Sequence, residues 1–588
     1  MARMTPVSIT NKKRLVIAFT IFCLLLVVLC IRVGYVQVVK GDVYKKKAIA
    51  QQTKDEVVEA KRGGIVDRNG EELAVSTIKY SVWVRPAAAA DKAEKEKVIS
   101  RLAQILGMPQ DEVGKKLSGK TALVKLAKYR SLSTADKIRK AGLPGVTITE
   151  ETKRYYPLGD FASQLLGSVT DDNNGLAGVE QYYNRQLKGV AGRWIENTDV
   201  KGNSLTYGND KHYGAQDGDN IQLTIDEVIQ NYAEESIVST MKSTKAKRVS
   251  CLVMNPKTGE ILAMASTPGY DPNNSRKPLA KDKAAFDKMS SKKQLEYLNK
   301  MWRNPLVSDS YEPGSTFKLL TTAMALEENK VNQTETFECG GGLNVNGTFI
   351  KCWIYPGSHG TQDLKHAVGN SCNPVFMRLA QRVGKDRFYD YLDLFGITEK
   401  TGIDYPGEAS AQIQNKKNVG LVELSTMGFG QGIAVTPIQL LTTINSFGNN
   451  GLMMQPHLVK AIKNSSGKTI KTIKPKVVRK TVSHNTSKRI KEYMEFVVKE
   501  GGGTKAQIKG YRVGGKTGTA QKKSANSNKY DKLIASFVGM APINDPRLSI
   551  LYIVDEPEGE VWGSDVAAPG AQKVLKKTLR YMKIKESD

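Results

Sequence analysis

The sequence lacks the arginine-rich and aromatic-interleaved basic stretches that typify nucleic-acid-binding proteins. Its net charge is nevertheless +28, from 87 Lys and Arg against 59 Asp and Glu. This excess is either a solvated, lysine-rich surface or an attraction for a polyanion such as an anionic lipid or an acidic wall polymer. We therefore expect no nucleic-acid partner.

Internal repeats are also absent. Charged residues make up 25% of the chain and hydrophobic ones 40%, which is ordinary globular composition. A chain of 588 residues has enough material for several domains and a large core.

Charge is missing from one long segment near the N-terminus, Leu15 to Ile31, which follows the basic stretch Asn11 to Arg14. A segment of this length is at the short end of a membrane span, and the apolar residues after Arg32 can extend it. No small-x-small cleavage pattern follows, so we predict an uncleaved signal anchor over residues 15–38 rather than a signal peptide. A buried core helix is the alternative.

The short tail of residues 1–14 is expected to stay in the cytoplasm. Arg32, Lys40 and the run Lys45 to Lys47 on the other side reduce the charge asymmetry, but long following domains are translocated largely regardless of charge. We therefore predict a single-pass protein of the cell membrane whose folded part is extracellular.

Two regions follow the span. Residues 39–218 are mixed and polar, with a strand-like YSVWVRP and a helix around Lys92 to Leu106, and we call this region the pedestal. The polar, glycine-containing stretch Asn209 to Asp219 is a connector, and a second domain is predicted over residues 219–588.

The second domain begins with a short strand that runs into an amphipathic helix, with Thr224 and Asp226 as capping residues. CLVMNPKTGEILAMAST predicts a hairpin, two more strands are predicted within 533–557, and a last helix over 570–583. Strands at both ends and a mainly helical middle predict one mixed α/β domain. Its sheet would take strands from both ends of the domain.

A serine and a lysine three residues apart, Ser315 and Lys318, begin a helix-forming run after the break at Pro313 and Gly314. They would share one face of the first turn, where free N–H groups and the helix dipole can stabilise an oxyanion. The apolar turn that follows would lower the pKa of Lys318, so that the neutral amine could take the proton of the serine hydroxyl. A helix cap followed by a solvated lysine also explains this short pattern.

Two further patterns make the first one specific. Ser371 and Asn373 offer a second hydroxyl and a carboxamide, and the strand-like Lys516 to Thr519 offers a cation and two hydroxyls. Such a strand can hold a substrate carboxylate, and its glycine lets a substrate backbone come close, as in edge-strand recognition. The order S-x-x-K, S-x-N, K-T-G, with gaps of about 50 and 140 residues, is the serine–lysine set of β-lactamases and penicillin-binding proteins.

With these motifs the chain resembles the class B, monofunctional penicillin-binding proteins of the division and sporulation type, over nearly everything after the anchor. The resemblance rests on several sequence stretches that match landmarks of this family, although each stretch by itself could be a turn or a packing element. The landmarks are RGGIVDRNGEELA, RYYPLGDFASQLLGSV and GLAGVEQYYNRQLKG with Gly178 and Glu180 in the pedestal, and YPGE, GFGQGIAVTPIQL and GSDVAAP in the catalytic part. The resemblance implies a penicillin-recognising transpeptidase domain, an antiparallel sheet flanked by helices, on an elongated α+β pedestal with one transmembrane helix.

The resemblance implies peptidoglycan cross-linking by D,D-transpeptidation. Ser315 would attack the carbonyl of the penultimate D-alanine of one peptide stem, with Lys318 as general base. Ser371 would relay a proton to the leaving D-alanine amine, with Lys516 nearby, and Asn373 would hydrogen-bond the substrate peptide.

The K-T-G-T strand would complete the site. Thr517 and Thr519, with Gly518 between them, would bind the terminal carboxylate, and the backbone N–H groups of Ser315 and Thr519 would form the oxyanion hole. An acceptor amine from a second stem would then take the acyl group, and β-lactams would trap Ser315. No cofactor is expected for catalysis.

A glycosyltransferase-like block is not found in the pedestal sequence. Polymerisation of lipid II is therefore expected to belong to a polytopic membrane glycosyltransferase that docks on the anchor and the adjoining extracellular segment. The alternative is that the RGGIVDRNG box merely packs the pedestal against the transpeptidase domain.

Three rival functions share parts of this pattern. A β-lactamase must hydrolyse its acyl-enzyme, and no deacylating carboxylate motif is recognisable. A β-lactam-sensing receptor would need a signalling domain, which the residues before the span cannot supply. A catalytically dead division scaffold disagrees with the intact three motifs. The sequence leaves open whether the enzyme serves division, elongation or the spore cortex.

Three of the six cysteines fall within 34 residues, and one histidine lies among them. Cys339, Cys352, His359 and Cys372 give C-x12-C-x6-H-x12-C, the ligand set of a closed tetrahedral zinc site, although there is no C-x-x-C knuckle. A Cys339–Cys352 disulfide and free thiols are the alternatives. We predict a structural zinc ion that holds the Ser371–Asn373 loop.

Overall fold

The computed structural model describes residues 9–45, 53–89, 91–119, 121, 123–197, 211–332, 334–522 and 531–586. The chain divides into two compact units. One comprises Met1–Ala60 and Val190–Gln216, and the other comprises Lys61–Gly189 and Asp217–Asp588.

The first unit contains one long apolar helix. Helix α1 (Ile9–Gly34) continues as a π-helical segment (Tyr35–Val39), so that 31 residues are helical and none of their side chains is buried. Its length and composition fit a single-pass membrane anchor, which confirms that part of the prediction.

The first unit also contains a three-stranded antiparallel sheet in the order β1-β6-β7, and its strands are β1 (Thr53–Val58), β6 (Gly192–Asn197) and β7 (Lys211–Tyr213). The predicted connector over 209–219 therefore includes a strand. The sequence gives little sign of it, because three residues are too few to reveal an alternating pattern.

A five-stranded antiparallel sheet forms the centre of the second unit, in the order β10-β9-β23-β22-β21. Its strands are β9 (Arg248–Met254), β10 (Ile261–Thr267), β21 (Gly514–Lys522), β22 (Lys532–Ala541) and β23 (Leu548–Asp555). Strands from both ends of the predicted domain thus pair in one sheet, as expected, and β21 is an edge strand.

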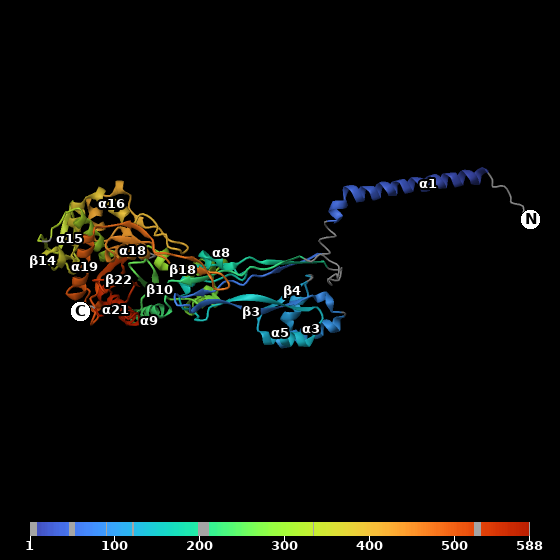
Figure 1. The fold of residues 1–588 in the computed structure, drawn as a ribbon, viewed down its shortest axis with the longest axis horizontal. Helices are drawn as coiled ribbons and strands as arrows, with labels where there is room; N and C mark the ends of the chain where they lie inside the picture. Colours follow the sequence, from blue (N-terminus) through green and yellow to red (C-terminus); the bar gives the residue numbers. More distant parts are fainter. Residues whose placement is uncertain are drawn as a thin grey trace, which may run out of the picture. The chain divides into compact units, whose positions relative to one another are not determined.

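Helices cover both faces of this sheet, because successive residues of its strands point to opposite sides. Cys251 and Val253 belong to a core shared with α9 (Glu227–Thr244) and α21 (Ala568–Tyr581), which lie side by side (Figure 1). Leu252 belongs to the larger core on the other face, shared with helices of the middle region. The mixed α/β fold predicted from the sequence is confirmed.

The middle region is mainly helical, as expected, but also holds short two-stranded pairs. Its helices are α10 (Lys283–Phe286), α11 (Ser291–Trp302), α12 (Pro305–Ser308), α13 (Lys318–Glu327), α14 (Leu364–Gly369), α15 (Asn373–Val383), α16 (Lys385–Leu394), α17 (Leu421–Met427), α18 (Pro437–Gly448) and α19 (His484–Lys499). The pairs are β11 (Thr336–Cys339) with β14 (Gly360–Asp363), β12 (Gly342–Val345) with β13 (Thr348–Lys351), β15 (Gln412–Ile413) with β16 (Ile433–Ala434), and β17 (Leu452–Met454) with β20 (Val477–Lys480).

A second, seven-stranded sheet joins pedestal strands to strands of the predicted catalytic domain. Its order is β19-β18-β8-β2-β3-β4, with β5 paired to β3. The strands are β2 (Ile65–Val66), β3 (Glu72–Val84), β4 (Val124–Arg130), β5 (Val146–Tyr155), β8 (Asn220–Leu223), β18 (Val459–Lys463) and β19 (Thr469–Thr472). The boundary at 218/219 remains a prediction.

The pedestal helices are α3 (Lys92–Leu106), α4 (Gln110–Leu117), α5 (Leu132–Ala141), α6 (Ser163–Leu166), α7 (Gly178–Tyr182) and α8 (Asn184–Lys188). Helix α3 has the predicted bounds. Asp226 caps α9 by accepting hydrogen bonds from the amides of Val228 and Ile229. The capping role expected of Thr224 is wrong, because its hydroxyl donates to backbone carbonyls at the start of β10 and near β18 instead.

Candidate active site

The predicted nucleophile, Ser315, lies in a tight turn rather than in an α-helix. Residues Gly314–Phe317 form a 3-10 turn, and α13 begins only at Lys318, which corrects the helix start expected at Ser315. Because a 3-10 turn has three residues per turn, Ser315 and Lys318 still project from the same side. Gly314 has a φ of 54°, and a Cβ there would lie 3.0 Å from the Thr519 carbonyl oxygen, so glycine lets this turn rest on β21.

Lys318 is fully buried, and its amine points to the loop between α14 and α15. Its Nζ donates to the Ser371 carbonyl oxygen at 2.7 Å, to Ser371 Oγ at 3.1 Å and to Asn373 Oδ1 at 2.7 Å. Within the described residues, no hydrogen bond joins Lys318 to Ser315. The structure therefore brings Lys318, Ser371 and Asn373 together, with Ser315 one turn away.

Lys516 reaches the same hydroxyl from the edge strand. Its Nζ lies 3.0 Å from Ser371 Oγ and 3.0 Å from the Thr517 carbonyl oxygen, and its side chain is fully buried. The Ser371 hydroxyl thus lies between two buried amines, which come from segments almost 200 residues apart in the sequence.

Burial lowers the pKa of Lys318 to about 8, although the nearby thiols of Cys352 and Cys372 act in the opposite direction. Burial, followed by the charge of Lys318, lowers the pKa of Lys516 well below its ordinary value. Two like charges that share one hydroxyl disfavour each other, so the pair titrates as a unit. Near neutral pH the pair therefore contains one neutral amine.

Successive side chains of the K-T-G-T strand lie on opposite sides of the strand. Lys516 and Gly518 are buried, whereas Thr517 and Thr519 are half-buried, as alternation along β21 requires. The lysine and the two threonines therefore do not share one face of the strand. A Cβ at Gly518 would lie 2.5 Å from Ser536 Oγ and 3.1 Å from the Pro313 carbonyl oxygen, so this glycine permits the turn of Ser315 to pack on β21.

Ser371 itself has a left-handed backbone, with a φ of 52°. This conformation is uncommon for a residue with a side chain and costs about 1–3 kcal/mol. Neighbouring hydrogen bonds hold it, because the Ser371 amide donates to the Val368 carbonyl at 3.2 Å and the Cys372 amide donates to the Ala367 carbonyl at 3.0 Å. No sequence pattern could have revealed this strain.

The four predicted metal ligands lie in one cluster around that loop. The ligand atoms of Cys339, Cys352, His359 and Cys372 all lie within 4.8 Å of one another. His359 Nδ1 is 3.5 Å from Cys339 Sγ and 3.7 Å from Cys352 Sγ. Zinc bond lengths in a tetrahedral site place such a nitrogen and sulfur about 3.6 Å apart, so the cluster fits zinc.

The thiols of this cluster are buried, and all six cysteines of the chain are free. A hydrogen bond from the Cys372 thiol lowers the pKa of Cys352, and the same interaction raises the pKa of Cys372. Of these two thiols, Cys352 therefore loses its proton more easily, and the thiolate is the form that binds a metal.

An exposed tryptophan pair near the site was missed in the sequence. The rings of Trp353 and Trp562 are 6.1 Å apart, and about half of each side chain is exposed. Trp353 donates to the Asn370 carbonyl at 2.9 Å, and Gly563, next to Trp562, donates its amide to Thr519 Oγ1 at 3.2 Å. The pair thus connects the Ser371 loop to β21. No sequence pattern indicates that these two tryptophans are exposed and adjacent.

Comparisons with known proteins identify the family of this chain. Residues 249–576 match the penicillin binding protein transpeptidase domain, and residues 57–223 match the penicillin-binding protein dimerisation domain. Stage V sporulation protein D of Bacillus subtilis is 35% identical over 98% of this chain and 87% of its own length. Peptidoglycan D,D-transpeptidase FtsI of Escherichia coli is 30% identical over 94% of this chain and 89% of its own. The crystal structure of penicillin binding protein 2X from Streptococcus thermophilus superposes with a TM-score of 0.73 at 27% identity, over 90% of this chain and 80% of that one.

Proposed function

This chain belongs to the class B penicillin-binding proteins and is a peptidoglycan D,D-transpeptidase, and we propose that Ser315, Lys318, Ser371, Asn373 and Lys516 form its catalytic centre. The enzyme cross-links cell-wall peptide stems through a serine acyl-enzyme and is acylated by β-lactams. The observation that supports these residues most is the meeting of two buried lysine amines on one serine hydroxyl, next to the turn of Ser315.

In the proposed acylation, Ser315 Oγ forms a bond to the carbonyl carbon of the penultimate D-alanine. The neutral amine of Lys318 takes the hydroxyl proton. The peptide C–N bond then breaks, and Ser371, between the two lysines, passes a proton to the leaving D-alanine amine. An acceptor amine from a second stem then attacks the acyl-enzyme carbonyl. The same proton transfers run in reverse, and the ester bond to Ser315 breaks.

The terminal carboxylate of the substrate would decide which lysine is neutral. We place this carboxylate at Thr517 and Thr519, on the strand that also carries Lys516. A carboxylate there favours the charged form of Lys516, and the charge of Lys516 in turn favours the neutral form of Lys318. Substrate binding thus prepares the base. The oxyanion would accept hydrogen bonds from the amides of Ser315 and Thr519.

We expect the rate of acylation by penicillin to rise with pH and to level off above about pH 8. Lys318 must be neutral to act as the base, and its pKa of about 8 means that the charged form dominates at lower pH. Lys318→Ala should slow acylation by about 10²- to 10⁴-fold and remove this pH dependence. Stopped-flow acylation with a fluorescent penicillin measures both.

Lys330→Ala is the matched control, because Lys330 is an exposed lysine shortly after the end of α13. It should leave the pH profile unchanged. A flat profile in the unaltered protein, or an unchanged rate in Lys318→Ala, would show that Lys318 is not the base.

We also infer that Cys339, Cys352, His359 and Cys372 hold a structural zinc ion. The buried cluster of three thiols and an imidazole, with separations that suit tetrahedral zinc, supports this assignment. Four protein ligands leave no open position for water, so the ion would stabilise the loop of Ser371 and take no part in the chemistry.

The domain limits and the orientation are proposals as well. We propose a cytoplasmic tail (1–14), a transmembrane anchor (15–38), a pedestal (39–218) and an extracellular transpeptidase domain (219–588). The two family matches, which end at residue 223 and begin at residue 249, support a division near this position. A relative named for sporulation and one named for peptidoglycan transpeptidation support a role in cell-wall synthesis of the sporulation or division type.

We propose that a polytopic membrane glycosyltransferase docks on the anchor and the segment that follows it. Exposed apolar side chains along α1 support this, as do the exposed rings of Trp194 and Tyr213 in the first unit. The box RGGIVDRNG does not contribute, because Arg62 is buried against Glu180, and Asp67 accepts hydrogen bonds from the amides of Asn69 and Glu227. The box therefore packs within the second unit.

Copurification of the glycosyltransferase should fail when residues 12–60 are replaced by an unrelated membrane anchor. Membranes solubilised in mild detergent, followed by affinity capture of this chain, provide the measurement. Leu132→Ala, which removes an exposed apolar side chain from pedestal helix α5, is the control and should leave copurification intact. Undiminished copurification after the anchor exchange would refute the docking surface.

A further inference from the structure

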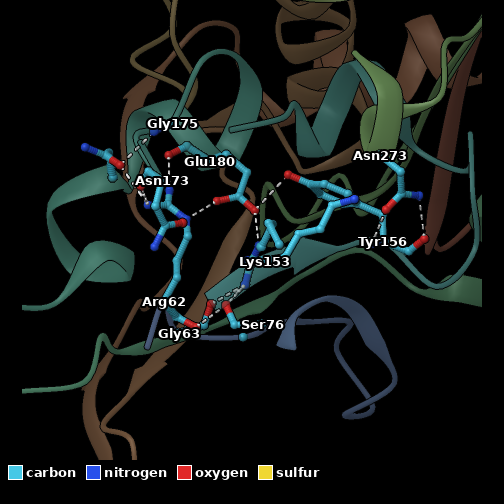
Figure 2. Close-up of polar contacts among 12 residues, drawn as sticks. Arg62, Gly63, Ser76, Lys153, Tyr156, Asn173, Gly175, Glu180 and Asn273 are labelled. Atoms are coloured by element: carbon cyan, nitrogen blue, oxygen red, sulfur yellow. Dashed lines mark hydrogen bonds and ion pairs between the residues drawn. The ribbon is translucent and has the colours of Figure 1, made fainter. Parts of the chain in front are cut away.

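A cavity of about 260 Å³ lies within the second unit, at a place that the catalytic mechanism does not use. It is bounded by the end of β5, by the turn at residues 169–173 and by the segment at residues 272–277 that follows β10. Asn273 joins these parts, because its side chain donates to the Tyr156 carbonyl and accepts from the Tyr156 amide, both at 3.0 Å (Figure 2). The cavity therefore lies where pedestal residues meet residues of the transpeptidase domain.

Basic side chains outnumber acidic ones in the lining. Lys153, Arg154, Arg276 and Lys277 line the cavity, against the single carboxylate of Asp171. Arg276 and Lys277 are exposed, and neither side chain has an ion pair or hydrogen-bond partner among the described residues. Two cations at the mouth of the cavity are thus available to a ligand.

The base of the cavity adjoins a buried charge cluster that is not neutral. Arg62 Nε contacts one oxygen of Glu180 at 2.7 Å (Figure 2), and Arg154 Nε contacts the other at 2.6 Å. All three side chains are buried. Burial by itself would raise the pKa of Glu180, but the charges and hydrogen bonds of the two arginines outweigh it and lower that pKa. Two guanidinium groups and one carboxylate leave one buried positive charge in excess.

The same cluster also contains a buried hydrogen-bond donor that has no partner among the described residues. Arg154 is 4% exposed, and its Nη2 has no hydrogen-bond partner among the described residues, nor has the buried hydroxyl of Thr152 beside it. Both residues line the cavity. Buried cations and donors without partners are costly, and an oxyanion in the cavity would offset the excess positive charge.

We propose that this cavity binds a carboxylate of an uncross-linked peptidoglycan stem, with Arg154 and Thr152 at its base and Arg276 and Lys277 at its mouth. The choice of stem rests on the proposed function, because the substrate polymer is the carboxylate-bearing ligand that the enzyme meets. At about 260 Å³ the cavity is slightly smaller than most ligand sites, so it would hold one charged group while the rest of the polymer extends past the mouth. The site would hold nascent wall polymer on the enzyme away from Ser315.

The test uses the full-length chain in detergent, first acylated with penicillin so that the active site is blocked. Isothermal titration with N-acetylmuramyl pentapeptide at about 0.15 M salt should show one binding site per chain. Binding should weaken at least about tenfold in the double variant R276Q/K277Q and several-fold in Thr152→Val. Melting curves establish that these variants are folded.

The matched control is K281Q/K283Q, which removes two exposed lysines from the neighbouring segment without altering the cavity lining. It changes the net charge equally and should bind the peptide as the unaltered chain does. Equal weakening in both double variants would mean diffuse charge attraction and overturn the site.

Two further titrations identify the occupant. A stem peptide in which every carboxylate, the C-terminal one included, is amidated should bind much more weakly, and inorganic phosphate should not bind more tightly than the carboxylate peptide. Equal binding of the amidated peptide, or tighter binding of phosphate, would overturn the assignment to stem carboxylates. Mass spectrometry before the titration shows whether the protein has been acylated. Failure of acylation would contradict the proposed function. Failure of the acylated protein to bind the peptide would contradict only the proposed carboxylate site.

Discussion

Replacing Ser315 by alanine will abolish covalent labelling by penicillin, whereas the unaltered chain will gain the mass of one β-lactam. The reason is geometric: Ser315 lies in a tight turn on β21, one turn from the buried amine of Lys318, and its hydroxyl is the nucleophile that this arrangement can activate. Intact-protein mass spectrometry before and after penicillin treatment measures the adduct directly. The expected loss is complete, because the other serine hydroxyl of the site, that of Ser371, is already held by both lysine amines.

Ser310→Ala is the matched control, since it removes a half-buried serine hydroxyl five residues before the nucleophile. Its adduct should be unchanged. The adduct on the unaltered chain should also persist for hours, and rapid turnover of a chromogenic cephalosporin would instead indicate a β-lactamase. An adduct that survives Ser315→Ala would remove this serine from the mechanism.

Loss of the cysteine–histidine cluster will lower stability and acylation together. Elemental analysis of purified protein should find about one zinc ion per chain. Cys372→Ser and His359→Ala should each lower the melting temperature by about 10 °C, because a metal bound only by the folded chain contributes its binding energy to folding. They should also slow acylation by about 10- to 100-fold, since Cys372 lies between Ser371 and Asn373 and both contact Lys318.

Cys251→Ala is the control that distinguishes the effect of losing the metal from the effect of losing a buried thiol. Cys251 is fully buried in the sheet, outside the cluster, so its replacement creates a small cavity and lowers stability without changing the zinc content. Metal-free protein with a Cys339–Cys352 cross-link in non-reducing peptide mapping would refute the zinc site. Unchanged acylation in a Cys372→Ser protein that has lost its metal would refute the link to the Ser371 loop.

The sequence by itself determined the membrane anchor, the α/β class of the second domain and the three motif positions. Each depends on local chemistry: an uncharged apolar run, alternating and helical patterns, and turns marked by glycine and proline. The helix at Lys92–Leu106 and the strands at both ends of the domain were predictable for this reason. Short strands such as β7 were not, because three residues carry no period.

Only the tertiary structure decided how the motifs meet. The resemblance implied that Lys516 lies near Ser371, but only long-range packing sets the contact of its amine with the Ser371 hydroxyl, to which Lys318 also points. The left-handed backbone of Ser371, the separations within the thiol cluster and the excess buried charge of Arg62, Arg154 and Glu180 likewise depend on contacts between distant segments. Local patterns specify elements, but distances and the balance of buried charge are set by which elements pack together, and a single sequence does not state that.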